Sequence, residues 1–100
     1  MNCMDNLKKL GALGEKAPNA MKYFQNFNES AFADGAVPLK YKELIALGVA
    51  LTTQCSYCLE LHREKAIAAG ASSEEIAETA FVAAAIRAGG AVTHATHLID

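Results

Sequence analysis

The stretch Gln54–His62 reads QCSYCLELH and carries two cysteines and a histidine within eight positions. Cys55 and Cys58 are three residues apart, so at the start of a helix their thiols can form a reversible disulfide. Unpaired backbone N–H groups and the helix dipole stabilise a thiolate at such a position. His62 follows Cys58 by one helical turn and therefore lies on the same helix face. The pattern indicates a thiol–disulfide redox site.

The composition predicts one domain with no nucleic-acid partner. The chain has 100 residues, of which 52% are hydrophobic and 20% charged. It is too apolar for a disordered protein, and charges interrupt it too often for a membrane span. The net charge is −2 and the basic residues are scattered, which argues against a phosphate-binding surface. The excess apolar surface predicts a homo-oligomer.

The N-terminal residues 1–15 are expected to form a tail or a short helix, and residues 16–100 a helical domain. No basic region followed by an apolar run is found in the first fifteen residues, so we expect no signal peptide and a cytoplasmic location. In a reducing compartment, a close cysteine pair is more often catalytic or metal-binding than structural. The third cysteine, Cys3, lies in this tail and is expected to have no role.

Helical periodicity along the chain predicts an all-α fold, a bundle of five or six helices with no strands. A short helix is expected over residues 4–13, closed by Gly14, and an amphipathic helix from Pro18 to residues 34–35. A third helix begins at Pro38 and continues into the unbroken apolar run 44–51. A helix that is apolar all round is expected to be buried on all sides. One of the threonines at 52 and 53 is expected to cap the cysteine helix, which ends at Gly70.

The C-terminal part is expected to form a long helix of small apolar residues. Ser72 with Glu75 reads as a capping box that starts it. We expect it to run to about residue 88, to be the second buried helix, and to provide an assembly surface. The glycines at 89 and 90 are expected to interrupt it, and a last helix over residues 91–99 carries His94 and His97.

Metal binding is the main alternative that the residues alone leave open. Cys55, Cys58 and His62 are acceptable zinc ligands, and a catalytic zinc needs only three ligands and a water. A structural zinc needs more, and His94 and His97 could supply them only if the last helix folds back. Haem attachment is excluded because the residue after the second cysteine is not histidine. We expect no cofactor.

Glu43 completes a more specific pattern. It lies twelve residues before Cys55, where the charged start of a helix gives way to the apolar run, and spacing alone does not link it to the cysteines. Together, Glu43, the motif Cys55-x-Tyr57-Cys58 and His62 resemble the alkylhydroperoxidase D / carboxymuconolactone decarboxylase family. Residues 42–47 and 84–97 are similar too, so the resemblance covers residues 20–97. It implies an all-helical fold whose short members assemble as trimers or hexamers.

The resemblance also implies a catalytic cycle between dithiol and disulfide. Cys58 is then the peroxide-attacking thiolate and Cys55 the resolving thiol, with Glu43 and His62 as a proton relay. The substrate is a hydroperoxide or a protein disulfide, and the partners are a peroxiredoxin and a lipoyl or thioredoxin-like electron donor. Helix-dipole reasoning instead favours Cys55 as the more acidic thiol, so the choice between the two cysteines stays open.

Tyr57 is a departure from the peroxidase that names the family, which has histidine just before its second cysteine. Tyrosine is a poor base at pH 7, so Tyr57 is expected only to line the site, and the dithiol–disulfide cycle is a safer prediction than peroxidase activity. A further alternative is a cofactor-free decarboxylase or lyase acting on a small lactone, with His62 as general base. Carboxymuconolactone decarboxylases generally lack this cysteine pair, which argues against that alternative.

Overall fold

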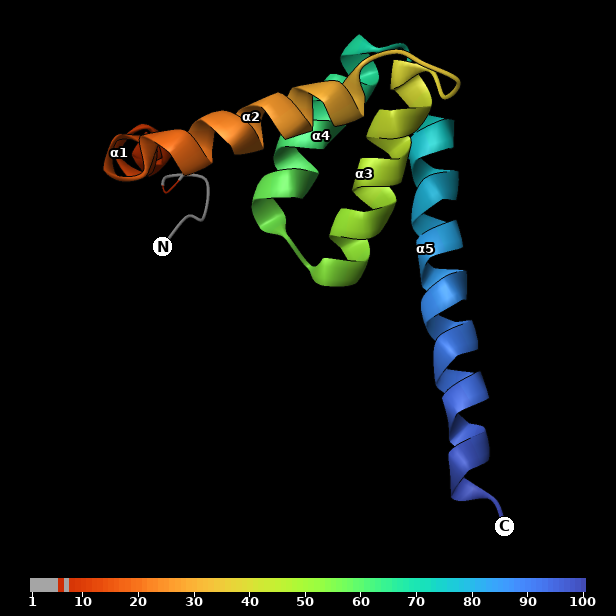
Figure 1. Ribbon diagram of the computed structural model, residues 1–100. Helices are drawn as coiled ribbons and strands as arrows, with labels where there is room; N and C mark the ends of the chain where they lie inside the picture. The colour runs from red at the N-terminus through yellow and green to blue at the C-terminus, as the bar shows by residue number, and fades with distance from the viewer. Residues whose placement is uncertain (1–5, 7) are drawn as a thin grey trace.

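The computed structural model describes residue 6 and residues 8–100, and the regular elements in this part of the chain are all helical. The predicted all-α fold class is confirmed, with five α-helices in the described residues (Figure 1). The elements in chain order are α1 (Leu10–Lys16), α2 (Pro18–Phe32), α3 (Leu39–Thr53), α4 (Ser56–Ala68), α5 (Ser73–His94) and the 3-10 helix η2 (Ala95–Leu98).

Helix α3 is the centre of the fold. It packs against α4 on one side and against α5 on the other, whereas α4 and α5 do not pack together within the described residues (Figure 1). The small core lies where these helices meet the loop after α4. Its members, all buried or partly buried and apolar, are Leu44, Leu47, Leu59, Ala66, Ala71 and Ile76. Because α3 contacts both neighbours, it sets how α4 and α5 lie relative to each other.

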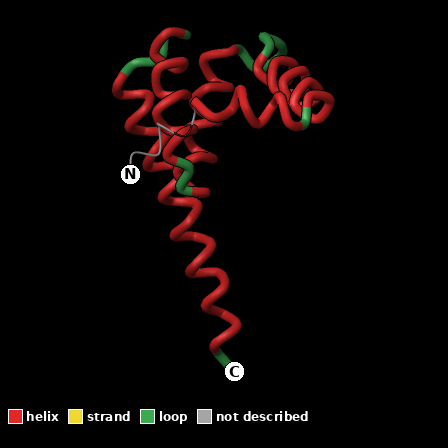
Figure 2. Tube along the Cα trace, turned by 90° about the vertical axis from the view of Figure 1, so that its left-hand side faces the viewer, coloured by secondary structure: helices red, strands yellow, loops and turns green. Residues whose placement is uncertain are grey.

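Two parts of the chain extend from this centre in different directions. Helices α1 and α2 form an arm that meets α3 at the C-terminal end of α2 (Figure 1). Helix α5 continues well past the other helices, so that the C-terminus lies far from them (Figure 2). The radius of gyration is 16.8 Å, against about 13 Å for a compact domain of 100 residues. The single chain is therefore an open structure with much exposed apolar surface.

Helices α3 and α4 end in the same way. Gln54 has a left-handed backbone with φ 57°, and the next N–H, that of Cys55, donates to the Ala50 carbonyl at 3.1 Å. After α4, Gly70 has φ +99°, and the next N–H donates to the Ala66 carbonyl at 2.9 Å. In both places an N–H donates to the carbonyl five residues before it, which is the Schellman arrangement and turns the chain sharply. At the end of α3 it lets α4 begin after only two intervening residues.

The start of α4 differs from the prediction that Thr52 or Thr53 caps it. Both threonine hydroxyls donate backwards to the Val49 carbonyl inside α3, at 2.7 and 3.2 Å. The N-cap is Cys55, whose sulfur accepts a hydrogen bond from the first turn of α4. The threonines cannot cap because the left-handed residue that ends α3 comes after them.

Several other helix boundaries agree with the sequence. Helix α2 begins at Pro18, and α3 begins directly after Pro38. The capping box of α5 is confirmed: the Glu75 N–H donates to the Ser72 hydroxyl at 3.0 Å, and the Ser72 N–H donates to the Glu75 carboxylate at 2.9 Å. The same carboxylate pairs with Lys40 at 3.0 Å and so ties the start of α3 to the start of α5.

The expected breaks at glycine were wrong in two places. Helix α5 continues through Gly89 and Gly90 to His94, and a 3-10 helix, not a separate α-helix, follows it. A glycine costs a helix only about 1 kcal/mol, which the alanine-rich flanks on both sides tolerate. The helix expected at 4–13 is observed over Leu10–Lys16 and passes through Gly14. Residues 1–5 and 7, with Cys3 and the expected start of that helix, lie outside the described residues.

The expectation of two fully buried helices was also wrong for the single chain. In α3 only Glu43, Leu47 and Ala50 are buried, and Ile45 and Val49 are 57% and 56% exposed. Helix α5 has one buried residue among those described. The apolar runs are present, but this chain alone covers only one side of each helix.

Candidate functional site

The two cysteines occupy the first turn of α4. Cys55 is the N-cap and Cys58 is the third helical residue, so the Cys58 N–H points back and donates to the Cys55 sulfur at 3.3 Å. This is the position where a Ser or Asp normally caps a helix. Both thiols are free and half-buried. The predicted placement of the CxxC motif at a helix N-terminus is confirmed.

The two thiols differ in acidity. A hydrogen bond from the Cys58 thiol lowers the pKa of Cys55, and the backbone N–H groups of Cys58 and Tyr57 lower it further. The same hydrogen bond to Cys55, together with burial, raises the pKa of Cys58. Hydrogen bonds to a charged form favour that form. Cys55 is therefore the more acidic of the two thiols, in agreement with the reasoning from the helix dipole.

Glu43 and His62 form a pair across the α3–α4 contact. His62 Nδ1 lies 2.5 Å from Glu43 Oε1, and the two side chains are 13% and 4% exposed. An ionised carboxylate can only accept, so Nδ1 carries the hydrogen and Nε2 is left for another partner. Sequence spacing did not link these two residues to each other, and the packing of α4 on α3 brings them together.

Phe32 is a member of this group that the sequence reasoning missed. Its ring stacks on the His62 imidazole, with centroids 5.1 Å apart and planes inclined by 13°. Phe32 is one of several aromatic residues in the amphipathic helix expected from Pro18, and no spacing signal distinguishes it from the others. Three helices therefore meet at one imidazole: α2 at its face, α3 at its edge, and α4, which carries it.

The cysteine pair and the Glu43–His62 pair are not joined by a hydrogen bond among the described residues. His62 lies one helical turn after Cys58, so the two pairs share a face of α4. Tyr57, the predicted site-lining residue, is half-buried in the first turn between the cysteines. A proton passing between the pairs needs a water or a side-chain movement.

The zinc alternative gains no support from the geometry. Within residue 6 and residues 8–100, no three His, Cys, Asp or Glu side chains gather in a metal-binding group. The last helix does not fold back over the cysteines. His94 and His97 instead lie near each other at the C-terminal end, with ring centroids 5.8 Å apart.

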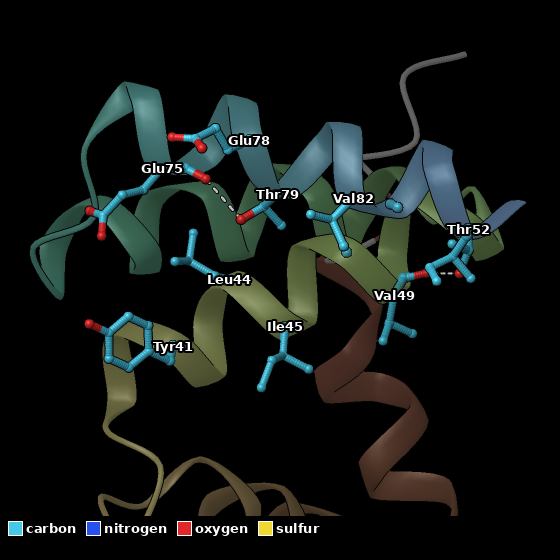
Figure 3. A pocket seen from close by; sticks show the side chains of 12 residues that line it. Tyr41, Leu44, Ile45, Val49, Thr52, Glu75, Glu78, Thr79 and Val82 are labelled. Atoms are coloured by element: carbon cyan, nitrogen blue, oxygen red, sulfur yellow. Dashed lines mark hydrogen bonds between the residues drawn. The ribbon is translucent and has the colours of Figure 1, made fainter. Parts of the chain in front are cut away.

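Two grooves flank α3. A groove of about 720 Å³ lies between α2, α3 and α4, and both Phe32 and Glu43 line it. A groove of about 610 Å³ lies between α3 and α5, where Tyr41, Ile45 and Val49 of α3 lie opposite Val82 of α5 (Figure 3). The first groove touches the candidate site, and the second is an apolar surface away from it.

The chain is similar to known proteins over most of its length. A family model described as carboxymuconolactone decarboxylase family matches residues 18–100. "Uncharacterized protein 4 in cox locus" of Paracoccus denitrificans is 42% identical over 91 residues, which cover 88% of this chain and 82% of that protein.

Two solved structures have the same fold. A protein from Methanobacterium thermoautotrophicum superposes with a TM-score of 0.81 at 35% identity, covering 86% of this chain and 97% of that one. An apo carboxymuconolactone decarboxylase family protein from Legionella pneumophila gives a TM-score of 0.80 at 30% identity, covering 93% of this chain and 83% of that one.

Proposed function

The chain belongs to the carboxymuconolactone decarboxylase family, and from this premise we propose that it is an alkylhydroperoxidase-like thiol–disulfide oxidoreductase. The observation that carries the proposal is the unequal thiol pair in the first turn of α4, on the helix face that also holds His62 with its buried carboxylate partner. Perturbed thiols beside a potential proton acceptor are typical of redox-active cysteines.

The proposed reaction reduces a hydroperoxide with the two electrons of the dithiol. A cysteine thiolate attacks the peroxide, an S–O bond forms as the O–O bond breaks, and the leaving alkoxide takes a proton to become an alcohol. The sulfur of the second cysteine then attacks the sulfenic acid, so that an S–S bond forms and water leaves. A lipoyl or thioredoxin-like dithiol restores the pair by exchange. A peroxiredoxin disulfide is the alternative oxidant.

The relay has a defined task in this reaction. Cys55 is already the more acidic thiol, whereas the raised pKa of Cys58 means that this thiol needs a base. In the proposed cycle His62, one turn after Cys58, receives that proton, and Glu43 holds the imidazole through Nδ1. Family resemblance assigns the attack to Cys58, and the relay makes that assignment chemically workable. We place the cycle in the cytoplasm because it needs a reducing partner.

The test is to treat the reduced protein with one equivalent of a hydroperoxide and to measure its mass. We expect a loss of two hydrogens, located at Cys55 and Cys58 by peptide mapping, and reversal by dihydrolipoamide. Cys55→Ser and Cys58→Ser variants are the controls, since neither can form the internal disulfide. A pair that stays reduced, or that reacts only after a chelator is added, contradicts the proposal. Lactone decarboxylation retained by the double serine variant would favour the lyase alternative.

We also propose that the working form is a homo-oligomer assembled through α5. Several apolar side chains of α5 are largely exposed in the described part of the chain; they include Val82, Ile86 and Val92, which are 64%, 70% and 72% exposed. Val82 (Figure 3) and Ile86 also line the apolar groove between α3 and α5. Each chain therefore offers both an apolar helix and an apolar groove, which suits pairing between copies.

A bilayer is the other surface that could cover such a helix. By length and composition, the helical segment Ser73–Leu98 is able to cross a membrane. Only 6% of its apolar 18-residue stretch is buried. The core helix of a soluble protein passes the same test. Arg87 lies near the middle of this segment, where a membrane would penalise it by about 3 kcal/mol, and its guanidinium donates to the Thr52 carbonyl at 3.2 Å. These observations favour a second copy.

Sedimentation of an Ile86→Lys variant tests the assembly. We expect a smaller particle than the wild type, and an unchanged particle for Ile67→Lys, a matched change on α4 at a side chain that is 48% exposed. Dissociation by the α4 change alone would move the interface away from α5. Binding of the wild type to phospholipid vesicles would favour the membrane instead.

A further inference from the structure

Phe32 is placed to control the orientation of the proposed relay. Its ring covers one face of the His62 imidazole at a centroid distance of 5.1 Å, while Glu43 holds the ring edge through Nδ1. We infer that Phe32 is a positioning residue for His62, and that α2 thereby keeps the imidazole in the plane needed for proton transfer. This inference rests on the proposed function of His62.

The hydrogen bond to Glu43 does not by itself fix the imidazole plane. A single bond at Nδ1 leaves the ring able to swing about the line that joins it to the carboxylate, and that swing changes the direction in which Nε2 points. A stacked aromatic ring, inclined here by only 13°, resists the swing because a large tilt would break the offset contact. The two contacts are therefore complementary: Glu43 fixes a point on the imidazole, and Phe32 fixes its plane.

The chain just after Phe32 is itself held in place. The Ala33 carbonyl accepts a hydrogen bond from Lys42 Nζ at 2.5 Å, and the Asp34 carboxylate accepts one from the Leu39 N–H at 2.7 Å. Lys42 precedes Glu43 on α3, so adjacent residues hold the α2 end and the imidazole. Among the described elements, the backbone of α2 comes close only to α1 and α3, and its contact with α4 is made by the Phe32 ring on His62. This end of α2 is therefore its attachment point to the centre of the fold.

Phe32 also lies between the imidazole and a groove. It lines the groove of about 720 Å³ between α2, α3 and α4, whereas His62 does not. Loss of the ring would open the imidazole face to this space and to water. Water that fills this space would replace the stacked ring and leave the imidazole plane free to turn, so the ring is expected to exclude water from this face as well as to orient the base.

The test compares three variants of the full-length reduced protein. Phe32→Leu removes the aromatic face and keeps an apolar side chain, Phe32→Tyr restores the face, and Phe27→Leu is the control on the same helix, at a ring that is 70% exposed. The rate of disulfide formation with tert-butyl hydroperoxide is the functional readout. We expect a fall of roughly tenfold in the maximal rate for Phe32→Leu with the peroxide KM unchanged, recovery in Phe32→Tyr, and no change in the control.

Proton NMR of the His62 ring gives a second readout that does not depend on activity. A stacked phenyl ring shifts the imidazole protons upfield, so we expect Phe32→Leu to remove this shift and Phe32→Tyr to keep it. Lys42→Met loosens the end of α2 without changing the ring. If Phe32→Leu does not fold, this variant takes its place, with an expected partial loss of both the shift and the rate.

The outcomes separate the inference from the function on which it rests. Phe32→Leu with normal His62 ring shifts and a normal rate overturns the positioning role. The role is also overturned if Phe32→Leu changes the ring shifts but keeps a normal rate while His62→Asn is slow. If His62→Asn reacts as fast as the wild type, the relay itself fails and the role inferred for Phe32 fails with it. A slow Phe32→Leu variant whose KM alone has changed assigns the residue to substrate binding and overturns the inference.

Discussion

Replacing Glu43 and His62 by leucine, singly and together, should show unequal and strongly coupled losses of stability. The carboxylate is the more buried partner, at 4% exposure against 13% for the imidazole. His62→Leu leaves a charged carboxylate without its partner, which costs about 3 kcal/mol of unfolding free energy in a site of this kind. Glu43→Leu leaves an imidazole that can become neutral, and it costs only the lost hydrogen bond, about 1–2 kcal/mol.

The double variant decides whether the pair is a buried unit. Two apolar residues in place of a buried pair are often nearly neutral, so the double variant should be more stable than His62→Leu alone. Urea unfolding followed by circular dichroism, under reducing conditions and at one protein concentration, gives the four free energies. The coupling should exceed about 1.5 kcal/mol. Losses that simply add, or a larger loss for Glu43→Leu, would refute the reasoning from burial and charge.

Three further predictions concern helix ends. At pH 7, iodoacetamide should modify Cys55 before Cys58. The lowered pKa of Cys55 increases its thiolate fraction at this pH, and the raised pKa of Cys58 decreases the thiolate fraction of that residue. Peptide mass spectrometry measures the order of labelling, and equal labelling contradicts the prediction. Ser72→Ala should lower the unfolding free energy by about 1 kcal/mol through loss of the capping box, measured by urea unfolding. Gly70→Ala should lower the unfolding free energy by about 1 kcal/mol because φ is +99° there. Gln54→Gly should raise it by a few tenths to about 1 kcal/mol, because Gln54 has a left-handed backbone that glycine adopts without strain. Thermal melts that rank the two changes the other way would contradict this prediction.

The helix boundaries that could be predicted from sequence are those set by a few adjacent residues. Pro18 and Pro38 each fix a helix start through the backbone of one residue, and Ser72 with Glu75 fixes another through two hydrogen bonds within one turn. Gly70 ends α4 because it adopts a left-handed conformation without strain. These signals need no knowledge of the tertiary fold.

The predictions that failed depend on what surrounds a segment. Ile45 and Val49 belong to an apolar run, and the inference that such a run is buried assumes that one chain supplies every neighbour. Here α4 and α5 cover only part of α3. The cap of α4 failed for a related reason, because the left-handed conformation of Gln54 moved the start of the helix past both threonines. A non-glycine residue in that conformation has no reliable sequence signal.

The candidate site shows the same division between local and tertiary information. The CxxC motif and His62 follow from spacing on one helix, and the structure places both as expected. Glu43 is nineteen residues from His62, so only the family resemblance connected them before the structure was known. Phe32 had neither signal. Its role depends on where α2 ends relative to α4, which no pattern within α2 encodes.

The tight turn between α3 and α4 determines the order in which a proton can travel. Because Gln54 ends α3 and Cys55 at once caps α4, the two helices run back along each other from the cysteines. His62 lies four residues beyond Cys58, about 6 Å along the axis of α4. Glu43 contacts it from α3, the other helix of this hairpin. His62 therefore lies between the thiols and the carboxylate along the hairpin, so in the proposed relay a proton that leaves Cys58 through a water or a side-chain movement reaches the imidazole before Glu43. In the proposed relay Glu43 acts on the thiols through His62, so removing His62 should abolish any effect of Glu43 on the rate of disulfide formation.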